Sequence, residues 1–268
     1  MKKMCNQENK SQKLTPDLDK NLILIKEILG TSSDVVIRRF KVGFNQCEAF
    51  LLYIDGLANQ TFVSESIMKS LMLETPLIKK AFPYNKRLAA QIKESLLTVG
   101  EIQEEAELGT VLSLVLSGDT ALCLEGSDQS LIISTKGFEN RGVTEPATET
   151  VIRGPREGFS ESLRINTSLI RRKIKNPNLR LEQQKIGRQT QTEICIAYIK
   201  GICNEETVTE LKKRLSRIDT DAILESGYIE SFIEDEPYSL FPTIGNTEKP
   251  DAVAAKILEG RIAVIVDG

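Results

Sequence analysis

The sequence contains no histidine, and its five cysteines include no CxxC pair. Without histidine the chain cannot build a His-containing metal site, or a Ser-His or Cys-His nucleophile pair of its own. An odd number of cysteines without paired spacing favours reduced, buried thiols in an intracellular compartment over a disulfide framework. These absences exclude much of hydrolase chemistry, and no metal site is predicted.

Long apolar runs and phosphate-binding loops are also missing. No window approaches the roughly 20 apolar residues that a membrane-spanning helix requires, and the start, MKKMCNQENK, lacks the apolar core of a signal peptide. The chain is therefore predicted to be soluble and not exported. Neither GxGxxG nor GxxxxGK[ST] occurs, so a nucleotide site would lack its phosphate cradle. Glu104 and Glu105 could serve acid/base chemistry, but adjacent residues on a helix point apart, so we interpret them as surface charge on a helix. With no catalytic motif in the sequence, we predict neither an enzyme nor a cofactor.

The composition is that of an ordinary globular protein. Apolar residues make up 40% of the 268 residues and charged residues 27%. This length is enough for one large domain or two small ones, each with its own core. The net charge of −3 gives no global reason to expect a nucleic-acid partner.

Two stretches about 145 residues apart resemble each other. LYIDGLAN at 52–59 and AYIKGICN at 197–204 share tyrosine, isoleucine, glycine and asparagine in register. Further on, GDTALCLEG at 118–126 matches GRIAVIVDG at 260–268 in the same order. Buried strands that precede a turn and a helix can resemble each other by chance, but the repeated order favours a duplicated α/β unit.

The predicted fold is therefore α/β, with two α/β subdomains related by internal duplication, each a small mixed sheet with helices. Asn59 and Asn204 are predicted to cap the helix after the first strand of each copy. By analogy with the hairpin expected around Gly126–Gln129, the second copy is expected to continue past Gly268 into a partner strand. The predicted strands are 49–54, 121–124, 131–134, 194–199 and 262–266, and the predicted helices include 18–29, 85–99 and 108–116.

We divide the chain by these elements into four parts. Residues 1–17 are polar and are predicted to be a disordered tail. Residues 18–142 form an N-terminal subdomain, residues 143–160 a connector, and residues 161–268 a C-terminal subdomain.

The connector carries the most distinctive motif of the chain, VIRGPREGFS at 151–160. Proline lacks an amide donor and pushes the residue before it out of the helical region, so Arg153-Gly154-Pro155 cannot be regular helix. Ser160 is predicted to cap a helix that presents Leu163 and Ile170 on one face and ends before Pro177. The motif thus predicts a shaped loop that leads directly into a basic helix.

The string VIRGPREGFSESLRINTSLIRRKIKNPNLR at 151–180 resembles the signature of the GerA-type spore germinant receptor A subunit. The pieces QTEICIAYIKGICN and EGRIAVIVDG are similar to that family too. The resemblance implies a soluble N-terminal domain that precedes transmembrane helices, on the cytosolic side of the spore inner membrane. It also implies B and C subunits as partners, an oligomer of A subunits, and a response to small nutrients. On this basis we expect the chain to be truncated before a membrane region.

Two groups of residues are candidate sites. The connector group could bind a carboxylated ligand or form an interdomain latch, because guanidinium groups pair bidentately with carboxylates. We prefer the latch or an inter-subunit contact. The second group is a basic surface that is either a plain solvated face or faces a partner subunit or anionic lipid headgroups, with nucleic acid disfavoured. The connector group is Arg153, Gly154, Pro155, Arg156 and Glu157; the basic surface is Arg171, Arg172, Lys173 and Lys175.

The resulting hypothesis is a domain that serves receptor assembly and signal transmission during spore germination. The alternative is a nutrient-binding module with its ligand in the cleft between the subdomains, since such clefts commonly hold small molecules.

Overall fold

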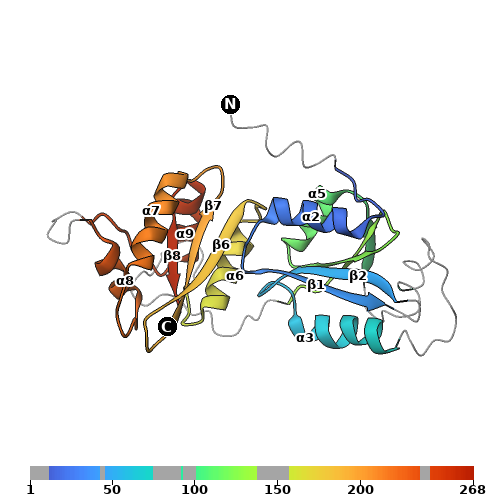
Figure 1. The fold of residues 1–268 in the computed structure, drawn as a ribbon, viewed down its shortest axis with the longest axis horizontal. Coiled ribbons are helices and arrows are strands. Elements are labelled where there is room, and N and C mark those ends of the chain that lie inside the picture. The colour runs from blue at the N-terminus through green and yellow to red at the C-terminus, as the bar shows by residue number, and fades with distance from the viewer. Residues whose placement is uncertain (1–11, 43–45, 75–91, 93–100, 138–156, 236–241) are drawn as a thin grey trace. The chain divides into compact units, whose positions relative to one another are not determined.

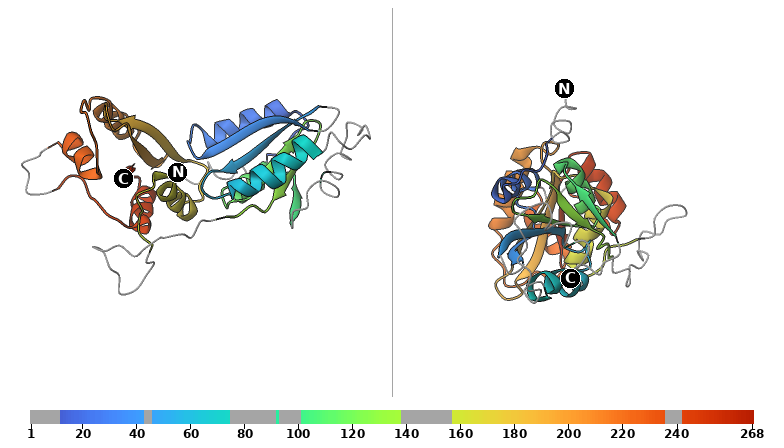
Figure 2. Two further views of the ribbon diagram at one scale, coloured as in Figure 1. Left: turned by 90° about the horizontal axis from the view of Figure 1, so that it is seen from below. Right: turned by 90° about the vertical axis from the view of Figure 1, so that its right-hand side faces the viewer.

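The computed structural model describes residues 12–42, 46–74, 92, 101–137, 157–235 and 242–268. The chain divides into two compact units. Unit 1 comprises residues 1–30 and 34–139, and unit 2 comprises residues 31–33 and 140–268. The chain therefore passes from one unit to the other at three peptide bonds, two of which flank the short segment Thr31–Ser33. Figures 1 and 2 show the ribbon from three directions.

Unit 1 contains one sheet with the strand order β1-β2-β4-β5-β3, in which every neighbouring pair is antiparallel. A helix that begins with α3 continues through the π-helical stretches η1 and η2. The elements are α2 (Leu18–Leu29), β1 (Val35–Val42), β2 (Cys47–Ile54), α3 (Gln60–Phe62), η1 (Val63–Met68), η2 (Ser70–Glu74), β3 (Ile102–Glu105), α5 (Leu108–Val115), β4 (Thr120–Leu124) and β5 (Ser130–Ile133).

Unit 2 contains a smaller antiparallel sheet with the order β6-β7-β8. Its elements are α6 (Leu163–Lys173), β6 (Leu179–Ile186), β7 (Thr192–Ile199), α7 (Glu205–Ser216), α8 (Ser226–Ile233), α9 (Pro250–Leu258) and β8 (Ala263–Val266).

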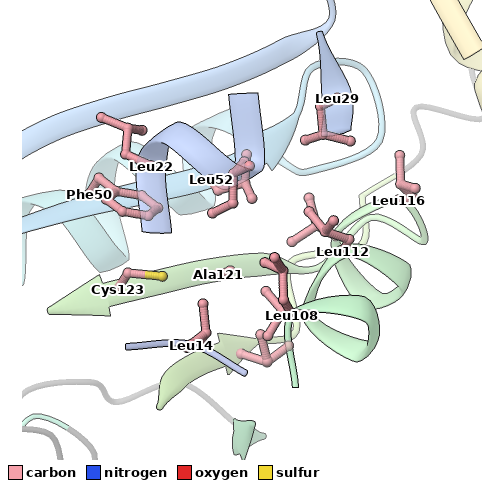
Figure 3. Close-up of a cluster of buried hydrophobic side chains, with 14 of the residues drawn as sticks. Leu14, Leu22, Leu29, Phe50, Leu52, Leu108, Leu112, Leu116, Ala121 and Cys123 are labelled. Atoms are coloured by element: carbon pink, nitrogen blue, oxygen red, sulfur yellow. The ribbon is translucent and has the colours of Figure 1, made fainter. Parts of the chain in front are cut away.

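Strand β2 is buried on both faces and thereby organises the core of unit 1. Successive side chains of a strand point to opposite faces, so β2 contributes to two apolar clusters. Phe50 and Leu52 pack with residues of α2 and α5 in the cluster that Figure 3 shows. Ala49 and Leu51 join the other cluster with residues of η1 and η2. The sheet of unit 1 is therefore covered by helices on both faces.

Unit 2 repeats this scheme around β7. Cys195 and Ala197 pack with residues of α6 and α9. Ile194 and Ile196 face the opposite side and pack with residues of α7 and α8. In both units two helices share one face of the sheet: α2 and α5, which precede β1 and β4, in unit 1, and α6 and α9, which precede β6 and β8, in unit 2.

The duplication extends to individual hydrogen bonds. In unit 1 the amide oxygen Oδ1 of Asn21 accepts from Thr15 N at 2.9 Å, and its Nδ2 donates to Thr15 O at 2.6 Å. In unit 2 Asn166 makes the same two bonds with Ser160, at 2.8 and 2.6 Å. Both asparagines are 2% exposed. Each asparagine therefore holds the residue that precedes its helix, Thr15 or Ser160, against the helix.

A second repeated pair of bonds ties the start of each helix to the end of the last matching strand. The carboxylate of Glu125 accepts from Leu18 N at 2.9 Å, and that of Asp267 accepts from Leu163 N at 2.7 Å. A carboxylate there satisfies a free helix amide and lies at the positive end of the helix dipole. This bond in unit 2 corrects the expectation for Ser160, because α6 begins at Leu163 and the cap is supplied by Asp267.

The glycines of the repeated motif are required by the same turn in both units. Gly56 and Gly201 follow β2 and β7 with φ of 81° and 83°, a region that side chains other than glycine rarely adopt. Gly118 and Gly260 have positive φ, and a Cβ there would lie 3.2 Å from Leu57 O and 3.1 Å from Ile202 O. The same backbone conformation is required at these positions in both units, which explains why the glycines recur in the two halves of the sequence.

Most predicted elements are confirmed within one or two residues. Asn59 and Asn204 cap α3 and α7 as predicted, each accepting a backbone N–H at 3.0 Å. Four cysteines are free and buried as expected, and Cys5 lies outside the described residues. The expected helix at 85–99 also falls outside them, apart from residue 92.

Three expectations differ from the structure. Both sheets are wholly antiparallel and not mixed, because each strand pairs with its neighbours through hairpins or antiparallel returns. Residues 12–17 belong to unit 1 and not to a disordered tail, since Leu14 is 5% exposed and its N–H donates to Ala106 O. Glu104 and Glu105 lie in β3 and not on a helix.

The repeated asparagine lock predicts similar losses in the two units. Replacing Asn21 or Asn166 by alanine leaves a partly buried backbone N–H and C=O without these partners, and the loss of the two hydrogen bonds costs about 1–3 kcal/mol of unfolding free energy. Urea unfolding followed by circular dichroism measures the change, with the exposed Glu27 on α2 replaced by alanine as the control. Losses below about 0.5 kcal/mol, the range of ordinary surface substitutions, would show that neither asparagine stabilises its unit.

Candidate functional site

The candidate site lies in unit 2, where the last turn of α6 holds both the end of the connector and the segment Thr31–Ser33. Three consecutive basic residues, Arg171, Arg172 and Lys173, end this helix. Cations are favoured there because the carbonyl end of a helix carries partial negative charge. Their side chains point in different directions and contact different parts of the chain.

Glu157 is the connector residue of the predicted group that the structure describes. Its carboxylate accepts a short hydrogen bond from Arg172 and another from Lys173 Nζ at 3.2 Å. Burial alone would raise the pKa of this carboxyl, but the hydrogen bonds and charges of Arg172 and Lys173 outweigh it and hold the pKa below its usual value. Glu157 therefore forms a latch to α6, within unit 2.

The other members of the predicted connector group, Arg153, Gly154, Pro155 and Arg156, lie outside the described residues. Their assignment as ligand or interdomain contacts stays a prediction.

Arg171 does not belong to the predicted exposed basic surface, because its side chain is 1% exposed. Its Nη1 donates to Asn176 O at 3.2 Å, and its Nη2 donates to Leu179 O at 3.3 Å and to Ser32 Oγ at 3.1 Å. The planar fork of a guanidinium can serve several acceptors at once, which an ammonium group does less well. Arg171 thus fixes the segment Thr31–Ser33 to the loop between α6 and β6.

Hydrogen bonds to the backbone of Leu181 complete this attachment along the outer edge of β6. Ser32 Oγ accepts from Leu181 N at 2.9 Å. Ser33 N donates to Leu181 O at 2.8 Å, and Ser33 Oγ donates to the same oxygen at 2.9 Å. The segment therefore satisfies backbone groups on a strand edge that would otherwise be open.

The remaining predicted basic residues differ in exposure. Arg172 and Lys173 are half-buried by their pairing with Glu157, and Lys175 is exposed. Lys175 is thus exposed, whereas the other three contact groups within unit 2, and contact of Lys175 with a partner or an anionic surface stays a prediction.

The sequence analysis did not identify Ser32, Ser33 or the burial of Arg171. The internal repeat did not predict the burial of Arg171, because the residue at the equivalent place in unit 1 is Lys26, which is exposed. One signal was available, because Arg171 directly follows Ile170 and lies eight residues after Leu163, and both of these residues are on the predicted apolar face.

Other shifted ionisable groups in the described residues have structural causes. The pKa of Tyr198 is raised by burial and by the 2.6 Å bond from its hydroxyl to Glu182. Burial raises the pKa of Cys123 to about 12, so its thiol is unreactive. Within the described part of the chain, no group of three or more His, Cys, Asp or Glu side chains is placed to hold a metal ion, and no helix is long and apolar enough to cross a membrane.

Comparison with known proteins gives consistent results. Residues 24–268 match the family described as Bacillus/Clostridium GerA spore germination protein. Spore germination protein KA of Bacillus subtilis (strain 168) is 44% identical over 256 residues, which are 95% of this chain and 46% of that protein. Spore germination protein B1 of the same organism is 36% identical over 252 residues, covering 94% of this chain and 51% of that protein.

A solved structure is also similar. The crystal structure of the N-terminal domain of the A subunit of the Bacillus megaterium spore germinant receptor GerK3 has a TM-score of 0.74 and 39% sequence identity. The match covers 96% of this chain and 93% of that one. The chain spans about half the length of the curated relatives it matches.

The buried Arg171 predicts a large loss of stability on substitution. Arg171→Met keeps most of the volume but leaves Ser32 Oγ, the buried carbonyl of Leu179 and the partly buried carbonyl of Asn176 without this donor, which costs about 2–4 kcal/mol of unfolding free energy. Arg171→Lys is expected to fall between wild type and Arg171→Met. Urea unfolding measures both, with the exposed Lys175→Met as the matched control. Equal stability of the Arg171→Met and Lys175→Met proteins would contradict this role.

The latch predicts a specific pH dependence. Because the pKa of Glu157 is lowered in the folded state, its contribution is present above the unfolded value of 4.5 and is lost as the pH falls through the folded value. Glu157→Gln should cost about 0.5–1 kcal/mol at pH 7, as for partly exposed ion pairs, and nothing at strongly acidic pH. Chemical unfolding across this pH range tests it, with the exposed Glu161→Gln as the control. A difference that does not change with pH would rule out the ion pair as its source.

Proposed function

The chain belongs to the GerA family of spore germination proteins, and from this we propose that it is the N-terminal domain of a nutrient germinant receptor A subunit that acts in receptor assembly and signal transmission. The similarity to the GerK3 A-subunit domain over nearly the whole of both chains supports the placement within the receptor. B and C subunits are the proposed partners, with several A subunits in one receptor at the spore inner membrane and this domain on its cytosolic side.

The observation that carries the transmission role is the attachment of Thr31–Ser33 in unit 2. This segment is joined covalently to the last residues of α2 on one side and to β1 on the other, and both belong to unit 1. Any movement of α6 that displaces Arg171 also displaces Ser32 and Ser33, because the hydrogen bonds and the chain link them. A change in unit 2 is therefore passed to unit 1 through two peptide connections of fixed length.

The Glu157 latch supports the same role from the connector. It fixes the end of the third connection to the helix that carries Arg171. Ser32 and Glu157 thus both contact the last turn of α6, Ser32 through Arg171 and Glu157 through Arg172 and Lys173.

Spores whose receptor subunit carries Ser32→Ala or Glu157→Ala test the proposal. Ser32→Ala removes the hydroxyl that binds Arg171, and Glu157→Ala removes the carboxylate that binds Arg172 and Lys173, so we expect slower germination in response to nutrients when protein amounts are matched to wild type. Germination rates are measured against a panel of amino acids, sugars and monovalent salts, with protein amounts checked by immunoblot. The exposed Ser231 on α8, replaced by alanine, is the control.

Two results would overturn the proposal. Wild-type germination by spores that carry both Ser32→Ala and Glu157→Ala would exclude a transmission role for these ties. Saturable binding of one nutrient to the isolated chain by isothermal titration would instead make this domain the sensor.

A further inference from the structure

One side of α8 carries large apolar side chains that are exposed. Leu224, Tyr228 and Phe232 are 64%, 42% and 49% exposed. The spacing of four residues places Tyr228 and Phe232 on one side of the helix, and Leu224 lies just before its first residue. In the described part of the chain seven large apolar residues are exposed, and these three fall within nine residues of sequence. Such a local group is typical of a surface that binds another molecule.

The helix that presents this apolar group is fixed to unit 2 at both ends. Its residues Ile229 and Ile233 are buried in the cluster that includes residues of α7 and β7 (Figure 1). At the end of α8, Arg214 Nη1 of α7 donates to Ile233 O at 2.7 Å. Before its start, Ile223 is 1% exposed, and its carbonyl accepts from Thr192 Oγ1 at 2.6 Å. The exposed side chains therefore stand on a well-anchored backbone.

The segment that carries the apolar group is acidic. From Asp219 to Asp235 the sequence has six acidic residues and neither lysine nor arginine. Three of the six pair with arginines from outside the segment. The other three, Glu225, Glu230 and Glu234, form no ion pair within the described part of the chain. Unit 2 thus leaves negative charge beside the exposed apolar side chains uncompensated.

This charge decides which kind of molecule fits the apolar group. Anionic lipid headgroups and nucleic acid attract Lys and Arg, and they repel carboxylates. A symmetric contact between two copies of α8 would bring like charges together, because such an interface uses the same patch on both partners. A protein surface that carries Lys or Arg beside an apolar groove complements both the apolar side chains and the carboxylates.

We propose that Leu224, Tyr228 and Phe232 form a docking surface for a basic segment of a different protein chain. The apolar side chains enter its groove, while Glu225 and Glu234, at the two ends of α8, pair with Lys or Arg at the rim. This inference goes beyond the proposed function, which assigns no residue of α8 to a partner. It does not involve α6, so the docking surface and the transmission role can fail independently.

Photo-crosslinking in spores that carry the full-length polypeptide tests the partner. Benzoylphenylalanine replaces Tyr228 or, in a second variant, Phe232, and the crosslinked peptides are identified by mass spectrometry. We expect both positions to crosslink to one segment of another chain that contains more Lys and Arg than Asp and Glu. Crosslinks to a segment without that excess, to lipid or to a second copy of this polypeptide would overturn the proposal. The absence of crosslinks from both variants at wild-type protein amounts would overturn it too.

Charge reversal tests the complementarity. Glu225→Lys combined with Glu234→Lys should lower the crosslink yield at least fivefold, and the milder pair Glu225→Gln and Glu234→Gln at least twofold. The control combines Glu27→Lys with Glu65→Lys, at two exposed acids of unit 1, and should keep the yield within twofold of wild type. Circular dichroism of the 268-residue chain verifies that each variant is folded. Equal yields from the α8 variants and the control would refute selection of the partner by charge.

Discussion

The structure depends on two strands, β2 and β7, that are buried on both faces and paired on both edges. Such a strand cannot be satisfied by a single layer of helices, so each unit requires a helix before it, a helix after it and a neighbour on either side. The apolar runs around Phe50 and Cys195 impose this arrangement twice in one chain. The repeated asparagine locks, carboxylate caps and turn glycines are the local means by which each helix is held to its sheet.

On this duplicated scaffold unit 2 carries features that unit 1 lacks. Arg171 is buried, whereas Lys26 at the equivalent place in unit 1 is exposed. Arg171 also binds Ser32, whose segment Thr31–Ser33 lies between two stretches of unit 1 in the sequence but belongs to unit 2. A buried guanidinium is costly unless its donors are used, and here they reach a hydroxyl and two backbone carbonyls. The feature that most clearly distinguishes unit 2 from unit 1 among the described residues is therefore this buried arginine at the end of α6.

The internal repeat made the fold predictable to an unusual degree, because buried strands, caps and positive-φ glycines leave local signals. The strands β1, β3 and β6 were missed, since charged and polar residues such as Arg38, Glu104 and Glu182 conceal the apolar pattern of a strand. The site was less accessible. That Arg171 is buried depends on Ser32, which lies far away in sequence, and no local pattern reports such a partner. Ser160 was misjudged for the same reason, because the true cap of α6 comes from Asp267.

The attachment of Ser32 to Arg171 also has a consequence for the order in which the protein takes shape during synthesis. The two residues are separated by 139 positions, so all of unit 1, which ends at Glu139, is synthesised before the arginine. Strand β6, which the segment covers, is synthesised after the arginine. Unit 1 can therefore form its core early, while the segment Thr31–Ser33 has no partner in unit 2 until α6 and β6 have been synthesised. Unit 2 cannot finish without a piece of chain made near the beginning, and a fragment that starts at Asn140 would lack it.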